Sequence, residues 1–195
     1  MLKQNAAEMT ARLVLVCHAS TAAVRAPAFP VDEPLDGHGL ERAAALAKTL
    51  PRLERCFSSP ELRTMQTAEA LGLNAVPLPS LRDCDYGTWR GRAYDDVVER
   101  EPDAIAEWLR DPSSAPHGGE PLQSLMRRVG EWLAGENVPR RQTIVVTHAS
   151  VIRAAIVYAI EADLPSFWRI DIAPLSVTRL TGDGRRWNLS EVSQP

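Results

Sequence analysis

The sequence is poor in cysteine and carries no excess of positive charge. Its three cysteines, Cys17, Cys56 and Cys84, are odd in number and lie at spacings unlike those of metal sites. We therefore expect reduced thiols in a cytoplasmic protein rather than a disulfide framework. The formal net charge of -3, with lysine and arginine scattered along the chain, provides no basic face for nucleic acid or for an acidic membrane surface.

Long apolar runs and low-complexity segments are also missing. Residues 1–12 hold one lysine and one arginine but no apolar stretch, and the run at residues 13–17 is too short for a signal peptide or a membrane span. Secretion and membrane insertion are therefore disfavoured. A length of 195 residues without internal repeats predicts a single domain over residues 1–195, with the helical middle of the chain as a candidate lid.

What the sequence does contain is an alternation of apolar runs with helical patterns. Residues 13–17 (LVLVC) and 143–147 (TIVVT) are typical of strands buried on both faces. The alternation predicts an α/β fold, a three-layer sandwich in which helices cover both faces of a mostly parallel central sheet. Further strands are expected at residues 55–58 and 74–76, and a closing hairpin at 176–180 and 187–192 with Asp183 and Gly184 in its turn.

Helical patterns separate these strands. Helices are expected at residues 39–50, 59–72, 94–110, 121–133 and 151–160. In the second of them Ser59 is expected to cap the helix, Pro60 suits the first helical position and Gly72 can end the helix. Residues 22–35, which contain three prolines, and residues 81–92 are expected to form loops.

Two histidines follow the two most strand-like runs, in LVLVCHAST and TIVVTHASV. The carboxyl ends of parallel strands form the ligand-binding edge of an open sheet, so His18 and His148 are expected to face one pocket. The residues leave open the alternative that each imidazole only hydrogen-bonds a carbonyl at the end of its strand.

Arg63, Asp83 and Asp85 are the other candidate functional residues. Arg63 lies in the first turn of the predicted 59–72 helix, where free N–H groups and a guanidinium together suit a phosphate. The alternative is a solvated surface arginine. Asp83 and Asp85 lie in a loop rich in glycine and aromatic residues, where a desolvated carboxylate can hold a proton near neutral pH, although most loop aspartates have no such role.

Six segments follow one another along the chain and carry a recognisable pattern. They are VCHAST from Val16, PLDGHGLERAAALAKTL from Pro34, SSPELRTMQTAEALG from Ser58, LRDCDYGTWRG from Leu81, PHGGEPLQSLMRRV from Pro116 and VVTHASVIR from Val145. In this order they resemble the histidine phosphatase superfamily, the phosphoglycerate-mutase-like proteins. The resemblance extends over residues 11–180. One segment alone is a weak signal, whereas six in the family order are a strong one.

The resemblance implies a role for each matching residue. His18 would be a nucleophile that forms a phosphohistidine, and Arg63 and His148 would hold the phosphoryl oxygens. Asp83, with Asp85 as the fallback, would protonate the leaving oxygen and then help to activate water. An acid role requires a pKa raised above the ordinary aspartate value of about 3.9. The resemblance implies no metal and no organic cofactor.

Three positions depart from the family pattern. Cys17 stands where the family has its first arginine, and Ala19 and Ala149 replace the glycines that follow the two histidines. Cys17 and Ala149 still fall at the phosphate-binding positions. A comparable oxyanion donor contributes about 10²–10³ in turnover, so the loss of the arginine predicts weakened catalysis. The alanines are harmless if their φ angles are negative.

Other residues offer replacements for the missing groups. Arg25, Arg90 or Arg153 could supply the cation, with the alternative that none does. Cys17 is not expected to act with His18 as a catalytic pair, because neighbouring residues of a strand point to opposite faces. The aromatic residues Tyr86, Trp89 and Trp108 either line a substrate pocket or belong to the core, and His117 is expected to be solvated on its loop.

These observations predict a phosphatase that hydrolyses a small phosphorylated substrate, without nucleic-acid or membrane partners. The alternative is a catalytically weakened or inactive family member that binds a phosphorylated ligand or protein. A lesser alternative is a phosphoglycerate-mutase-type phosphotransferase. The sequence leaves the natural substrate and the oligomeric state open, although a homodimer is the commonest assembly for soluble proteins of this kind.

Overall fold

The central element of the fold is a six-stranded sheet. The computed structural model describes residues 11–51, 55–135, 142–183 and 186–194. Within these residues the strand order is β3-β2-β4-β1-β5-β6. The strands are β1 Ala11–Cys17, β2 Arg55–Ser58, β3 Val76–Pro77, β4 Gln142–Thr147, β5 Val177–Gly182 and β6 Trp187–Ser193. Strands β1 to β4 are parallel, and the β5–β6 hairpin pairs antiparallel to β1. The predicted sheet and hairpin are confirmed, whereas Gly184 of the predicted turn lies outside the described residues.

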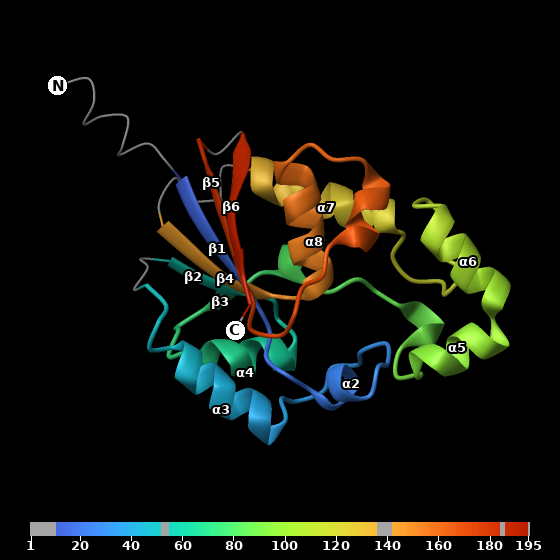
Figure 1. Ribbon diagram of the computed structural model, residues 1–195, viewed down its shortest axis with the longest axis horizontal. Helices are drawn as coiled ribbons and strands as arrows, with labels where there is room; N and C mark the ends of the chain where they lie inside the picture. Colours follow the sequence, from blue (N-terminus) through green and yellow to red (C-terminus); the bar gives the residue numbers. More distant parts are fainter. Residues whose placement is uncertain (1–10, 52–54, 136–141, 184–185, 195) are drawn as a thin grey trace.

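Helices cover both faces of this sheet. The α-helices are α2 Ala22–Arg25, α3 Gly37–Leu46, α4 Leu62–Ala70, α5 Tyr94–Arg100, α6 Pro102–Arg110, α7 Leu122–Ala134 and α8 Ala149–Ala159. Short 3-10 helices are η1 Pro79–Leu81, η2 Gly87–Trp89 and η3 Leu164–Arg169. Figure 1 shows α3 and α4 on one side of the sheet and α7 and α8 on the other, which gives the predicted three layers. None of the described helices is both long and apolar enough to cross a membrane.

The central strand β1 is apolar because both of its faces are covered. Successive side chains of a strand point to opposite faces. Val14 and Val16 pack in the cluster that includes residues of α4, whereas Leu13, Leu15 and Cys17 pack in the cluster that includes α7 and α8. Complete burial of one aliphatic side chain contributes about 1.5–3 kcal/mol, so this single strand stabilises both interfaces of the sandwich.

Helix α4 begins later than the sequence predicts. Ser59 does not cap it; instead the amide of Leu62 donates a 2.6 Å hydrogen bond to the carboxylate of Asp32. Ser59 is thereby available for other contacts. The other end agrees with the prediction, because Gly72 has a φ of +70° and its amide donates to the carbonyl oxygen of Glu69. Glycine adopts this left-handed conformation without the steric cost of a Cβ.

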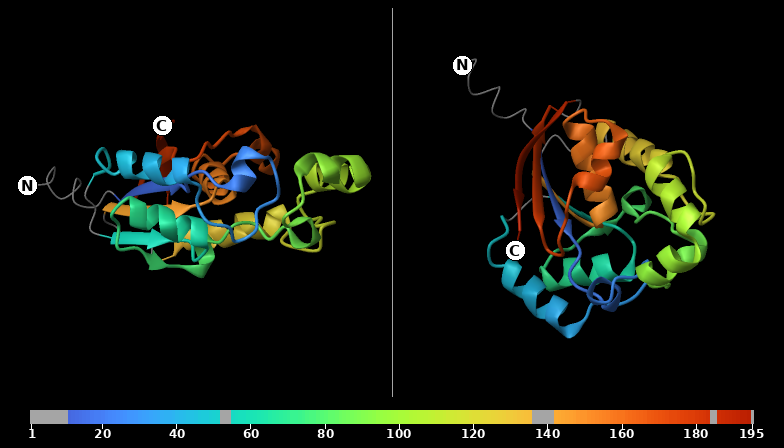
Figure 2. Two further views of the ribbon diagram at one scale, coloured as in Figure 1. Left: turned by 90° about the horizontal axis from the view of Figure 1, so that it is seen from below. Right: turned by 45° about the vertical axis from the view of Figure 1, so that its right-hand side comes forward.

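The predicted helix at residues 94–110 is divided into α5 and α6. Glu101 leaves helical geometry, with φ -133° and ψ 52°, and Pro102 opens α6, where its missing N–H is not needed. We call α5 and α6 the cap. Figures 1 and 2 show the cap beside the three layers rather than on a face of the sheet. The cap is joined to the molecule by a buried cluster of Phe29, Trp89, Val97, Ile105 and Trp108.

Candidate active site

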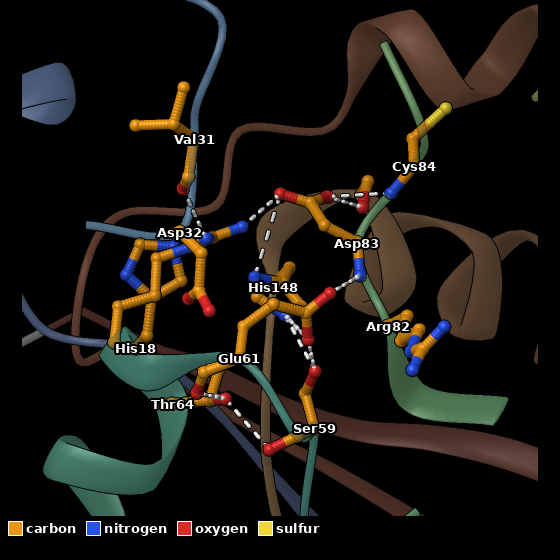
Figure 3. Close-up of polar contacts among 12 residues, drawn as sticks. His18, Val31, Asp32, Ser59, Glu61, Thr64, Arg82, Asp83, Cys84 and His148 are labelled. Carbon is orange, nitrogen blue, oxygen red and sulfur yellow. Dashed lines mark hydrogen bonds and ion pairs between the residues drawn. The ribbon is translucent and has the colours of Figure 1, made fainter. Parts of the chain in front are cut away.

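Three polar residues stand directly after neighbouring parallel strands. His18 follows β1, Ser59 follows β2 and His148 follows β4, which lies between the other two strands. Their side chains therefore meet at the carboxyl edge of the sheet. Arg63 reaches this edge from the first turn of α4, and Asp83 from the loop after η1. Figure 3 shows His18, Ser59, Asp83 and His148 gathered at this place.

The imidazole of His18 is held in one tautomer. Its Nδ1 lies 2.8 Å from the backbone oxygen of Ala19. Because a carbonyl oxygen only accepts hydrogen bonds, Nδ1 carries the proton and Nε2 keeps its lone pair. Burial above all, and then the charges of His148 and Arg63, hold the pKa of His18 well below its usual value. His18 is therefore a neutral imidazole with Nε2 free to attack an electrophile.

Arg63 is a buried cation whose Nε–H group is left without a hydrogen-bond partner among the described residues. Its Nη2 donates to Oδ2 of Asp83 and its Nη1 to the carbonyl oxygen of Val31, each over 2.8 Å. Its Nε is buried and has no hydrogen-bond partner among the described residues. An unpaired buried donor costs about 1–3 kcal/mol, so an anionic ligand that reached this Nε would be stabilised.

The carboxylate of Asp83 lies between Arg63 and His148. Besides bonding to Arg63, it accepts hydrogen bonds from the Cys84 amide over 2.9 Å and from the Ser150 hydroxyl, and it lies 3.5 Å from Nδ1 of His148. Burial raises the pKa of Asp83, but the charges of His148 and Arg63 and the Ser150 hydrogen bond outweigh burial and hold it well below its usual value. The upward pKa shift that an acid role requires is therefore absent from this arrangement, and Asp83 is ionised in the free protein.

The loop that carries Asp83 is fixed by an arginine and by a glycine. Arg128 of α7 donates a 2.8 Å hydrogen bond to the carbonyl oxygen of Ser80 and forms an ion pair with Glu120. Gly87 has a φ of +49°, and a Cβ at this position would collide with the backbone of the adjoining loop. Only glycine satisfies both conditions, so the backbone around Asp83 is held in one conformation.

Glu61 and Ser59 belong to the same cluster, although neither is predicted as a site residue. Nε2 of His148 lies 2.9 Å from Oγ of Ser59 and 3.2 Å from Oε2 of Glu61. Burial raises the pKa of Glu61, but the hydrogen bond and charge of His148 outweigh burial and lower it overall. The signal in the sequence is the polar run SPE directly after strand 55–58, a run that fits the start of a helix equally well.

Cys17 is unreactive, and the backbone at Ala19 and Ala149 is unstrained. Cys17 is 2% exposed, and burial raises the pKa of its thiol to about 12. A thiol with this pKa stays protonated at neutral pH and is a poor nucleophile. Neither alanine has a positive φ, so the replacement of glycine causes no backbone strain at either position.

The candidate replacement arginines lie in different places. Arg25 is largely exposed and forms an ion pair with Asp36 over 3.9 Å. Arg90 lines the same polar cavity as Arg63, whereas Arg153 lines a separate, mainly apolar cavity. Arg90 is thus the one of the three that lines a cavity together with Arg63 and Asp83.

The polar cavity, of about 310 Å³, contains more negative than positive side chains. Its arginines are Arg63, Arg82 and Arg90, and its carboxylates are those of Asp32, Glu61, Asp83 and Asp85. The carboxylate of Asp85 accepts a 3.0 Å hydrogen bond from the amide of Gly87, away from the contacts that join Asp83 to its cationic partners. Within the described ranges, no group of three or more histidine, cysteine or acidic side chains is arranged to hold a metal ion.

The aromatic residues divide between the core and a second cavity. Trp89 is fully buried in the cap cluster, whereas Tyr86 and Trp108 line a cavity of about 490 Å³. His117 is buried rather than solvated, which corrects the prediction. Its Nδ1 accepts a hydrogen bond from the Gly119 amide, and burial lowers its pKa.

Comparison with known sequences identifies relatives over most of the chain. The model of the histidine phosphatase superfamily (branch 1) matches residues 13–195. Phosphoserine phosphatase 1 of Hydrogenobacter thermophilus is 32% identical over 149 residues, which cover 71% of this chain and 70% of that protein. The bifunctional protein Rv2228c of Mycobacterium tuberculosis is 31% identical over 157 residues, which cover 75% of this chain but only 43% of that protein.

Solved structures share the same architecture. The alpha-ribazole phosphatase from Shigella flexneri has a TM-score of 0.83 at 22% identity, with 94% of this chain and 96% of that chain covered. This likeness concerns the fold alone. The mycobacterial glucosyl-3-phosphoglycerate phosphatase Rv2419c has a TM-score of 0.77 at 25% identity, with 92% of this chain and 97% of that chain covered.

Proposed function

Because this chain belongs to branch 1 of the histidine phosphatase superfamily, we propose that it hydrolyses small phosphate monoesters through a phosphohistidine on His18. The observation that carries the proposal is the free Nε2 of His18, whose ring is fixed by the bond from Nδ1 to Ala19 and lies 5.3 Å from the ring of His148. Phosphoserine phosphatase 1 and glucosyl-3-phosphoglycerate phosphatase are both named for phosphate ester hydrolysis, which supports the same general chemistry.

The phosphoryl group would lie among Nε2 of His18, the guanidinium of Arg63 and Nδ1 of His148. Arg63 and His148 both face the carboxylate of Asp83, and the anionic phosphoryl group of the substrate would compete with this single carboxylate for them. The unpaired Nε of Arg63 and the backbone amides at the start of α8, from Ala149 on, would add donors. Such fixed donors stabilise the negative charge that develops on phosphoryl oxygens during transfer.

In the first step, Nε2 of His18 attacks phosphorus, and the N–P bond forms as the bond to the leaving alcohol oxygen breaks. The leaving oxygen needs a proton, but Asp83 is ionised in the free protein because its pKa is lowered. A phosphate monoester carries one proton of its own below its second pKa of about 6. Asp83 would accept this proton and transfer it to the leaving oxygen.

In the second step, water attacks the phosphorus atom of the phosphohistidine. The carboxylate of Asp83 would accept a proton from this water, the N–P bond would break and its electron pair would return to Nε2 of His18. Burial disfavours the imidazolium, as the lowered pKa of His18 indicates. The released imidazole is therefore neutral, and the site is ready for the next substrate once Asp83 passes its proton to the departing phosphate.

Hydrolysis of 4-nitrophenyl phosphate, measured from about pH 4 to about pH 8, tests this proposal. His18→Ala should lose at least about 10³-fold in turnover, because it removes the nucleophile. His38→Ala is the matched control, since His38 is an exposed residue near the start of α3. Rapid quenching of a radiolabelled substrate should trap phosphohistidine on the wild type and on His38→Ala but not on His18→Ala. Equal turnover by the wild type and His18→Ala would exclude the mechanism.

A second candidate function is the binding of a phosphorylated ligand without turnover. It is favoured by the neutral Cys17 at the family's arginine position and by the excess of carboxylates around the polar cavity. Titration calorimetry would then detect binding of a phosphate monoester to the wild type and to His18→Ala, and neither protein would release phosphate. Release of phosphate that depends on His18 would contradict this function.

A further inference from the structure

The cavity of about 490 Å³ lies between the cap, α8 and η3, and the proposed chemistry does not use it. Its size and its mainly apolar lining are typical of small-molecule sites. Trp108 comes from α6 of the cap, and Phe167 and Trp168 come from η3, so the walls are contributed by distant parts of the chain (Figure 1). Phe29 and Tyr86 add two more aromatic walls.

This aromatic cavity adjoins the proposed reaction site. Pro30 and Cys84 line both the aromatic cavity and the polar cavity that contains Arg63 and Asp83. Ser150 also lines the aromatic cavity, and its hydroxyl donates to the carboxylate of Asp83. A leaving group whose oxygen receives a proton from Asp83 would therefore extend past Ser150 into the aromatic cavity.

Arg153 is the one charged residue among those that line the aromatic cavity. Its Nε donates a 2.6 Å hydrogen bond to the carbonyl oxygen of Ile170, and its guanidinium carbon lies 5.7 Å from the centre of the Phe167 ring. These contacts fix the side chain, and no carboxylate in the described part of the chain forms an ion pair with it. The planar guanidinium still has Nη donors for a carboxylate.

We propose that Arg153 binds a carboxylate on the leaving group, so that the substrates are aromatic or branched apolar phosphate monoesters that also carry a carboxylate. This inference rests on the proposed function, because His18 and Asp83 define where the phosphoryl group lies. Tyr86 lines the same cavity, and because burial raises the pKa of its hydroxyl it stays an uncharged hydrogen-bond donor. A small polar leaving group would leave most of the aromatic surface without contact.

The test compares 4-carboxyphenyl phosphate with 4-carbamoylphenyl phosphate, an uncharged ester of nearly the same shape. The preference is the ratio of kcat/KM for the acid to kcat/KM for the amide. This ratio should be about 10-fold higher for the wild type than for Arg153→Met, as expected of one charge-assisted contact. Arg153→Lys should keep part of the preference. Arg169→Met is the matched control, because Arg169 of η3 is exposed and does not line the cavity.

Binding measurements separate a failure of this inference from a failure of catalysis. Calorimetry with 4-carboxybenzylphosphonate and 4-carbamoylbenzylphosphonate measures the same preference with compounds that cannot be hydrolysed, and thermal unfolding shows which variants fold. If no ester is hydrolysed, the proposed function fails, but binding of the acid that is about 10-fold tighter and depends on Arg153 still supports the assignment. Equal affinities, or a preference that survives in folded Arg153→Met, overturn it.

Discussion

The cluster of polar residues at the strand ends is built differently from the aromatic cavity, although Ser150 lines the cavity and donates a hydrogen bond to Asp83 of the cluster. In the cluster, Arg63 forms a buried ion pair with Asp83, and Nδ1 of the buried His148 lies 3.5 Å from the same carboxylate. In the cavity, aromatic rings surround open space, and Arg153 stands without a carboxylate partner among the described residues. The cluster leaves little room for variation in geometry, whereas the cavity leaves room for a ligand of variable shape.

This difference separates the proposed chemistry from the proposed choice of substrate. His18, Ser59 and His148 follow strands whose register is fixed by the sheet, so small displacements would break several contacts of the cluster at once. The cavity walls come from the cap, the loop around Phe29 and η3, which pack through apolar contacts. Variants in the cluster should therefore change turnover, and variants in the cavity should change affinity and selectivity.

After His18→Ala, the largest expected effect is the loss of activity in Asp83→Asn. Asparagine keeps the shape but cannot transfer a proton, so turnover of 4-nitrophenyl phosphate should fall by about 10²–10³-fold. Asp85→Asn is the matched control, because this exposed carboxylate bonds only to the Gly87 amide among the described residues. Thermal unfolding would show that both variants fold. A larger loss in Asp85→Asn would make Asp85 the acid and remove Asp83 from that role.

A gain of activity is expected from Cys17→Arg. The charges of Asp83 and Arg63 act on the thiol of Cys17, so an arginine at the end of β1 would place a further cation near this pair. Adding one oxyanion donor should raise kcat/KM for 4-nitrophenyl phosphate by about 10²-fold. Cys17→Ser, which changes the thiol without adding charge, should show no such gain. If Cys17→Arg folds but is no more active than the wild type, the missing arginine does not limit turnover.

A smaller effect is expected from Trp108→Leu in the cavity wall. Trp108 is buried and contacts the rings of Phe29, Trp89 and Trp168. Its truncation should lower the free energy of unfolding by about 2–3 kcal/mol and raise KM for aryl phosphates several-fold, with kcat nearly unchanged. Val98→Ala, at a more exposed position of the cap, should change both quantities little. A fall in kcat as large as the rise in KM would contradict the separation of the two regions.

The smallest expected effect is the change in the free energy of unfolding with pH. The pKa of His18 is lowered from its ordinary value of 6.5, so below about pH 6.5 the unfolded chain binds a proton that the folded protein does not. The free energy of unfolding should therefore fall by about 1–2 kcal/mol between pH 7 and pH 5. Denaturant unfolding of His18→Gln, which does not titrate there, should show a shallower dependence. Asp83 adds to the pH dependence only below about pH 4. Its pKa is lowered from 3.8, so its stabilisation of the fold is complete above that pH and is lost as the pH falls through the lowered value.

Much of the fold and part of the site could be predicted because they follow from local patterns. The buried runs at residues 13–17 and 143–147 indicate parallel strands, and this arrangement alone brings His18 and His148 to one edge of the sheet. The division of the 94–110 helix was missed because Tyr94 to Arg110 keeps a helical pattern on both sides of Pro102. A proline is also tolerated at the start of a helix, so the pattern cannot tell one helix from two.

The layers of the sandwich and the residues that end its strands can be read from the chain alone, because hydrophobic periodicity is a local property. That Asp83 is ionised, that Glu61 contacts His148 and that Arg153 faces an aromatic cavity follows only from the folded arrangement. Each of these depends on the distance between groups far apart in the chain. Electrostatic and packing energies follow such distances, and no spacing along the sequence specifies them.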